Sequence, residues 1–212
     1  MIKFVYFDLG GTVIKDFSAT NKWSEMKRYL GVKSTFSEEF DRLFDQYELN
    51  GLCISRDVDT LIPIFTEKFD MKFPQNFSFL SYLVNNFEKN TSIWPVISEV
   101  EKTCGIGLLT NMYTRMFATI KNKGLMPPNK WKVVIDSTAV GLQKPDRRIF
   151  ALAEAKAGAK AEEILFIDNT KNNIDAAKIC GWQTFLYDPV NPEESSRKLL
   201  EYVSTLGKSI YS

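Results

Sequence analysis

Short apolar runs alternate with helix-like patterns along the second half of the chain. The runs that read as strands cover residues 2–7, 106–110, 133–135, 164–167 and 184–187. Apolar residues at helical spacing lie between them, over residues 113–123, 146–157, 174–179 and 193–206. Strands that alternate with helices form parallel sheets with right-handed crossovers. The pattern predicts an α/β fold with a Rossmann-like, doubly wound parallel sheet of about five strands.

The segment of residues 16–92 has a different pattern. It contains few strand-like runs and four helix-like stretches, near residues 22–30, 37–49, 58–69 and 77–89. Aromatic side chains recur there at helical spacing, which is typical of the core of a small helical bundle. We therefore expect a core domain of residues 1–15 and 93–212, interrupted by an α-helical domain of residues 16–92.

Four short polar clusters stand out against this pattern, and three of them directly follow a predicted strand. They are Asp8-Leu9-Gly10-Gly11-Thr12, Thr110-Asn111, Lys144-Pro145-Asp146 and Asp168-Asn169. In an open parallel sheet, the carboxyl ends of the strands form one rim where ligands bind. We expect the four clusters to meet in one pocket.

The side chains in these clusters suggest phosphate chemistry. Asp8 and Asp168 would face each other, and two nearby carboxylates stay ionised only if a cation lies between them. Mg²⁺ suits such a pair, because it binds one or two carboxylates together with water and phosphate oxygens. Lys144 would add a second cation, and Thr110 and Asn111 would add hydrogen-bond donors. Together they indicate phosphoryl transfer through an aspartyl-phosphate.

Composition narrows the chemistry further. The chain has no histidine, which excludes Ser-His-Asp and Cys-His catalysis and any histidine-bearing metal site. Its net charge of +1 argues against a nucleic-acid partner. The local basic group is interpreted as a solvated face; its members are Lys121, Lys123, Lys130 and Lys132.

No apolar run approaches the length of a membrane span, and no signal peptide is visible. The three cysteines are odd in number and have no close pairing, as expected for buried thiols of a reducing compartment. We therefore expect a cytoplasmic protein with a small-molecule partner and no membrane partner.

The four clusters together resemble the motifs of the haloacid dehalogenase (HAD) superfamily of hydrolases, and more narrowly its phosphatases with a helical cap inserted after the first motif. Residues 8–12 resemble the first motif, Asp-x-Asp-Gly-Thr, and Thr110-Asn111 resembles the second. Lys144-Pro145-Asp146 resembles the third and Asp168-Asn169 the acidic fourth. The resemblance covers residues 2–15 and 95–190 as the core, with the segment between them as the cap.

The resemblance implies a role for each matching position. Asp8 would be the nucleophile and a metal ligand, and the Gly10 carbonyl and Asp168 would complete the protein ligands of Mg²⁺. Thr110 and Lys144 would grip the transferring phosphoryl group, and Lys144 would also compensate the charge of Asp8. Asn111 would help to orient a small phosphorylated substrate.

Two positions depart from the family pattern. The family's usual second Asp of the first motif protonates the leaving group and activates water, but Gly10 stands there. Asn169 stands where the fourth motif usually has a second acid. We expect one of two outcomes at the first position: a preference for phosphate esters with good leaving groups, or a proton supplied by another residue, with Asp16 as the first suspect.

Two other functions stay open at this stage. A 2-haloacid dehalogenase of the same superfamily also lacks the second Asp, but it carries Ser at the fourth motif and holds its substrate with a cap arginine. Arg28, Arg42 and Arg56 are the arginines available for that role. The third possibility is a binding protein that kept the fold and lost efficient catalysis.

Overall fold

A five-stranded sheet forms the centre of the protein in the computed structural model, which describes residues 1–208. The strand order is β5-β4-β1-β6-β7, and all neighbouring strands are parallel. Their bounds are β1 Phe4–Phe7, β4 Gly105–Thr110, β5 Val133–Asp136, β6 Ile164–Asp168 and β7 Gln183–Leu186. The predicted parallel sheet is confirmed.

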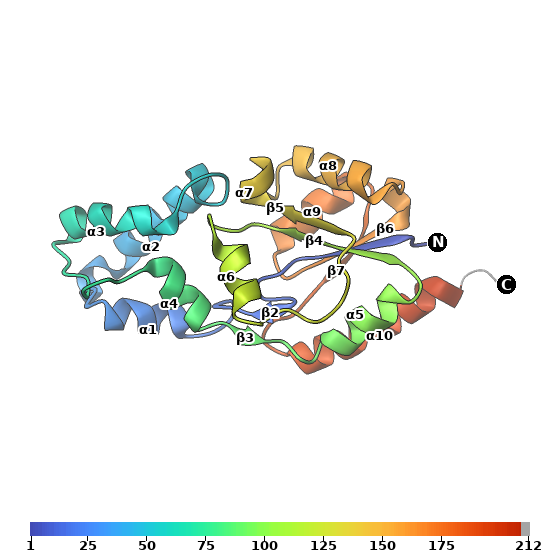
Figure 1. The fold of residues 1–212 in the computed structure, drawn as a ribbon, viewed down its shortest axis with the longest axis horizontal. Helices are drawn as coiled ribbons and strands as arrows, with labels where there is room; N and C mark the ends of the chain where they lie inside the picture. The colour runs from blue at the N-terminus through green and yellow to red at the C-terminus, as the bar shows by residue number, and fades with distance from the viewer. Residues whose placement is uncertain (209–212) are drawn as a thin grey trace.

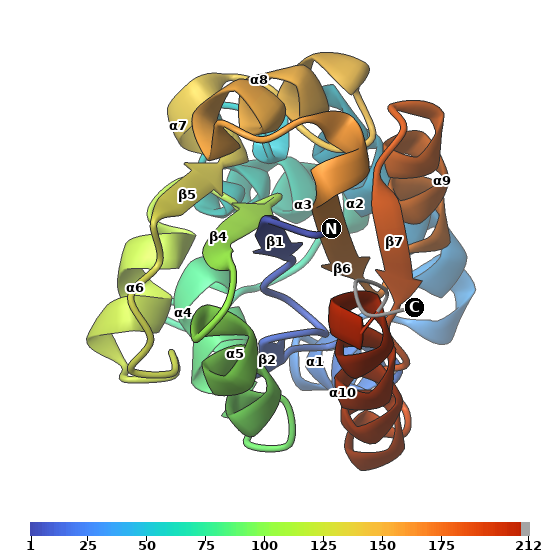
Figure 2. The same ribbon diagram turned by 90° about the vertical axis from the view of Figure 1, so that its right-hand side faces the viewer.

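Helices cover both faces of this sheet (Figure 2). One face carries α7 (Ser137–Val140), α8 (Arg147–Ala157) and α9 (Lys171–Ile179), and the other carries α5 (Trp94–Glu101), α6 (Met116–Asn122) and α10 (Pro192–Lys208). The strand β1 shows why both faces need covering. Its residues alternate between two hydrophobic clusters, with Tyr6 packed under α8 and Phe7 on the opposite side, and all four are buried. Strands buried on both faces are typical of doubly wound α/β proteins.

The remaining helices lie beyond one end of the sheet (Figure 1). They are α1 (Lys22–Tyr29), α2 (Ser37–Tyr47), α3 (Leu61–Phe69) and α4 (Phe79–Asn85), joined by the short turns η1 (Ser34–Phe36), η2 (Glu48–Leu52) and η3 (Val58–Thr60). We call the segment from α1 to α4 the helical insertion. Phe40, Phe65 and Phe79 are fully buried there and pack ring against ring. The aromatic pattern therefore builds a core, as expected.

One predicted helix of the insertion differs from the structure. The helix expected over residues 77–89 ends at Asn85, and β3 (Glu88–Lys89) follows it. This strand pairs antiparallel with β2 (Ile14–Lys15), and the pair forms a sheet separate from the central one. The strand that precedes the helical insertion and the strand that follows it thus lie side by side and pair through their backbone hydrogen bonds. The domain division at residues 16 and 92 stays a prediction.

Two helices in the core had not been expected. They are α5, which begins with Pro95 in its first turn, and the short α7, which Asp136 caps by accepting from the Thr138 amide. Proline in the first turn is a helix start signal that the sequence does carry. No helix within residues 1–208 has the length and apolar character to cross a bilayer.

Candidate active site

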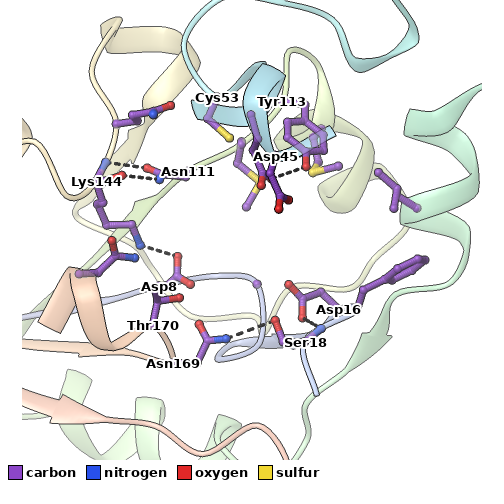
Figure 3. Close-up of a pocket in the computed structure, with 18 of the residues that line it drawn as sticks. Asp8, Asp16, Ser18, Asp45, Cys53, Asn111, Tyr113, Lys144, Asn169 and Thr170 are labelled. Atoms are coloured by element: carbon purple, nitrogen blue, oxygen red, sulfur yellow. Dashed lines mark hydrogen bonds and ion pairs between the residues drawn. The ribbon is translucent and has the colours of Figure 1, made fainter. Parts of the chain in front are cut away.

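A cavity of about 610 Å³ lies between the carboxyl ends of the strands and the helical insertion (Figure 3). The core contributes Asp8, Gly10 and Lys144 to its wall, and the insertion contributes aromatic and acidic side chains that include Trp23 and Glu48. The predicted meeting of distant motifs at one rim is therefore what the structure shows.

Lys144 joins the two predicted carboxylates. Its Nζ lies 2.8 Å from Asp8 Oδ1 and 2.6 Å from Asp168 Oδ2. The Lys144 and Asp168 side chains are 1% and 0% exposed, so this ion triad is almost dry. Buried charges of opposite sign must be paired, because an unpaired buried charge is strongly unfavourable. The triad brings together residues from the first, third and fourth motifs.

The pKa values of Asp8 and Lys144 reflect this balance of burial and charge. Burial raises the pKa of Asp8 to about 7; Lys144 opposes the rise and Asp168 adds to it. Burial alone would lower the pKa of Lys144, but Asp168 and Asp8 outweigh it, and the net pKa of the ammonium is raised. Lys144 therefore stays a cation in the site.

A layer of amides holds the triad in place. Asn111 Nδ2 donates to the Lys144 carbonyl (2.9 Å), and the Lys144 amide donates to Asn111 Oδ1 (2.8 Å). Asn173 Nδ2 donates to Asp168 Oδ2 (3.1 Å), and the Thr170 amide donates to Asp168 Oδ1 (2.7 Å). Asn111 thus fixes the backbone of Lys144, which adds a positioning contact to its expected role toward the substrate. Asn173, on the first turn of α9, had not been singled out from the sequence.

Thr110 ends β4 and is fully buried. Its Oγ1 has no hydrogen-bond partner among the residues that the structure describes. Buried hydroxyls in folded proteins nearly always have a partner, so one without a protein partner is suited to a ligand oxygen. Thr110 does not line the cavity itself, whereas the next residue, Asn111, does.

The turn of the first motif is packed tightly against its neighbours. Gly11 has a φ of +71°, in the left-handed region that favours glycine, and a side chain there would collide with Asn169. The side-chain Nδ2 of Asn169 donates to Ser18 Oγ at 3.2 Å. Asn169 therefore links the end of β6 to the loop between β2 and α1 instead of supplying a second acid.

Asp16 also faces the cavity, on the same side as Asp8 (Figure 3). The Ser18 amide donates to its Oδ1 at 2.8 Å. A Cβ atom built on Gly10 would lie 2.6 Å from Asp16 Oδ2. Burial raises the pKa of Asp16, and hydrogen bonds from Ser18 partly offset the rise.

The far wall of the cavity comes from the helical insertion and from the loop after β4. Tyr113 Oη donates to Glu48 Oε1 at 2.5 Å, and Gln143 Nε2 donates to the Leu49 carbonyl at 3.3 Å. Burial raises the pKa of Glu48, and it raises that of Tyr113 well above its ordinary value. These contacts connect the insertion to the core across the cavity. No pattern in the sequence predicts them.

A family model of haloacid dehalogenase-like hydrolases matches residues 2–181 of the chain. The chain belongs to this family. The match spans most of the sequence and includes all four motif clusters, so the resemblance drawn from these clusters is confirmed at the level of the superfamily.

Two solved structures of HAD proteins share the fold. A HAD family enzyme from Bacteroides thetaiotaomicron, solved with magnesium and inorganic phosphate, has a TM-score of 0.68 at 16% identity and covers 89% of this chain and 96% of its own. L-2-haloacid dehalogenase from Xanthobacter autotrophicus, solved with covalently bound chloropropionic acid, has a TM-score of 0.63 at 18% identity and covers 88% and 78%. At these identities the likeness shows the HAD fold alone.

One curated relative also matches. The chain is 26% identical over 195 residues to acyl-CoA dehydrogenase family member 10 of Mus musculus, an alignment that covers 89% of this chain. The chain spans 16% of the length of that protein.

The donor set of this HAD site fits Mg²⁺ bound together with a ligand. Asp8 and Asp168 both contact the Lys144 nitrogen, so their carboxylates already share one cation. Within residues 1–208, no group of three or more acidic or thiol side chains has the arrangement of a metal site. Two carboxylates with a main-chain carbonyl suit Mg²⁺, which keeps several waters and takes phosphate oxygens, and do not suit an all-protein cage.

Proposed function

We propose that this HAD hydrolase is a Mg²⁺-dependent phosphatase that acts on a small phosphorylated metabolite through an aspartyl-phosphate on Asp8. The proposal is carried by the buried ion triad of Asp8, Lys144 and Asp168, and it is supported by the Thr110 hydroxyl, which has no hydrogen-bond partner within residues 1–208. A carboxylate next to a fixed cation and a free hydroxyl donor matches the needs of phosphoryl transfer, in which positioning and charge stabilisation do most of the catalysis.

The residues of the site divide the tasks of this reaction. Asp8 attacks phosphorus, while Lys144 and Thr110 bind the equatorial oxygens of the transferring group. Asn111 holds the backbone of Lys144, and with it the ammonium, in place. Mg²⁺, held by Asp8, Asp168 and the Gly10 carbonyl, would neutralise phosphoryl charge when bound.

The helical insertion would serve as the cap. We propose residues 16–92 as the cap domain and residues 1–15 and 93–212 as the core, because the insertion leaves and rejoins the core at the β2–β3 pair and closes the cavity on one side. Its aromatic wall would select the substrate. The three cysteines are free, which favours the predicted reducing, cytoplasmic compartment.

The dehalogenase alternative is less well supported. None of Arg28, Arg42 and Arg56 lines the cavity, and Lys144 is the only cationic side chain that does among the described residues. A 2-haloacid would therefore have no arginine in the cavity to hold its carboxylate, and Lys144 is already shared by two carboxylates.

A substrate screen separates the three functions. Purified protein would be incubated with a panel of phosphorylated metabolites and with 2-chloropropionate, each with Mg²⁺ and with a chelator. We expect phosphate release that depends on Mg²⁺ and no chloride release. Chloride release without metal would replace the proposal by a dehalogenase, and no release of either would favour a binding protein.

Thr110→Val should separate stability from turnover. The substitution removes a buried hydroxyl that has no partner within residues 1–208, so we expect the free energy of unfolding to rise or stay unchanged. A hydrogen bond to a charged phosphoryl oxygen is worth about 1.5–3 kcal/mol, so kcat/KM should fall about 10–100-fold. Urea unfolding and steady-state kinetics on one preparation measure both. A destabilised variant with unchanged kcat/KM would contradict this role of Thr110.

A further inference from the structure

Gly10 has no side chain, and the carboxyl group of Asp16, which follows the first motif, lies next to it. The chain turns sharply after Asp8, with the Ile14 amide bonded to the Leu9 carbonyl at 3.0 Å, and β2 then brings Asp16 back to Gly10. A Cβ atom on Gly10 would meet Asp16 Oδ2 at 2.6 Å, closer than real Cβ contacts come. The Asp16 carboxyl group therefore fills the space that a side chain at residue 10 would enter.

Asp16 is held in this position from both sides. β2, which ends at Lys15, pairs with β3, and the Ser18 amide binds Asp16 Oδ1 at 2.8 Å. These contacts leave Oδ2 as the oxygen nearest Gly10. Asp16 and Asp8 both line the cavity, one on each side of the Gly10 turn in sequence.

We propose that Asp16 is the general acid and base of this enzyme, and that it takes over the task for which Gly10 has no side chain. This inference rests on the proposed phosphatase function. In the first half-reaction an Asp8 oxygen forms a bond to phosphorus, the bond from phosphorus to the ester oxygen breaks, and the Asp16 carboxyl group gives its proton to that oxygen. In the second, the Asp16 carboxylate takes a proton from water while the water oxygen attacks phosphorus and the bond to Asp8 breaks. Alcohol and inorganic phosphate leave, and both aspartates return to their starting states.

The other acids of the cavity are placed less well for this task. Glu48 lies on the helical insertion and accepts the Tyr113 hydroxyl at 2.5 Å. Asp45 also comes from the insertion, near the end of α2. Neither belongs to the turn that carries Asp8. Asp16 directly follows β2, and it is the acid whose carboxyl group reaches the Gly10 turn.

Leaving-group dependence tests the inference. The rate of Mg²⁺-dependent hydrolysis would be measured for a series of aryl and alkyl phosphates in the wild-type protein, in Asp16→Asn, and in Asp45→Asn as a control with the same charge change in the same cavity. We expect a shallow dependence on leaving-group pKa in the wild type and in Asp45→Asn. Asp16→Asn should show a steep dependence, with alkyl phosphates slowed about 10²–10⁴-fold and p-nitrophenyl phosphate slowed much less in its first step.

A second measurement detects the phosphorylated enzyme intermediate. With p-nitrophenyl phosphate, Asp16→Asn should release a burst of nitrophenol equal to the enzyme concentration and accumulate phosphorylated Asp8, detectable by mass spectrometry of the acid-quenched protein. A merely structural role of Asp16 would lower all rates together and would give no accumulation.

Moving the carboxyl group back tests the geometry. Gly10→Asp alone should impair the enzyme, because its Cβ would collide with Asp16. Gly10→Asp combined with Asp16→Ala should restore a shallow leaving-group dependence, since one carboxyl group again occupies the same space.

The outcomes keep the two proposals apart. Phosphate release by the wild type, with the same slope in Asp16→Asn and no burst, would overturn the role of Asp16 and leave the phosphatase standing. Absence of phosphate release from every ester, including p-nitrophenyl phosphate, would overturn the phosphatase and this inference with it.

Discussion

Asp8→Asn should reduce turnover of every phosphate ester by at least about 10⁴-fold, because an amide cannot form the acyl-phosphate intermediate; the loss of a catalytic nucleophile has effects of this size. The fold should be retained. The asparagine oxygen has the same position and still accepts from Lys144, while Asp168 remains as the charged partner of the ammonium.

Initial rates with p-nitrophenyl phosphate and a circular dichroism melt would be measured on the same sample. Ser98→Ala, on the exposed side of α5 and outside the cavity, serves as a control for handling losses. Full activity of a well-folded Asp8→Asn protein would remove Asp8 as the nucleophile and require another group to take its place.

Lys144→Met should damage both stability and activity. The substitution leaves Asp8 and Asp168 buried beside each other with no cation of the protein between them. Removal of one partner from a buried ion pair typically costs about 3–5 kcal/mol, so we expect a loss of unfolding free energy of this order at neutral pH. Turnover should fall as well, because the ammonium no longer binds the transferring phosphoryl group.

Lys171→Met is the matched control for that loss. Lys171 forms an ion pair with Asp175 on the surface of α9, with its side chain 74% exposed. Exposed pairs contribute about 0–1 kcal/mol, so the control should stay close to wild type in chemical denaturation. A Lys144→Met protein as stable as the control would show that the triad does not hold the site together.

The sheet was predictable because its signal is local. The apolar runs of β1, β4 and β6 are buried on both faces and end in polar residues, and parallel strands place those ends at one rim. The two-residue strands β2 and β3 were not predictable, since they form through backbone pairing of a kind that leaves no hydrophobic pattern. The helix α5 was missed although Pro95 marks its start.

The same contrast holds at the site. Asp8 and Asp168 could be named from the sequence because each lies at a strand end, and Lys144 because Lys144-Pro145-Asp146 resembles the third motif of the family. Asn173, which supports Asp168, could not be named, because it acts through one side-chain contact whose geometry depends on the folded chain. Asp16 was a suspect from its place after the first motif alone. Its relation to Gly10 became visible only when the turn and β2 were positioned in space.

The most direct test of the central proposal is to locate the phosphoryl group on the enzyme. Wild-type protein would be mixed with p-nitrophenyl phosphate and Mg²⁺, quenched in acid within the first turnover, and digested for peptide mass spectrometry. We predict that the peptide with Asp8 gains one phosphoryl group, that the label needs Mg²⁺, and that Asp8→Asn shows none. Phosphate release without a label at Asp8, or with a label at another residue, would contradict the account.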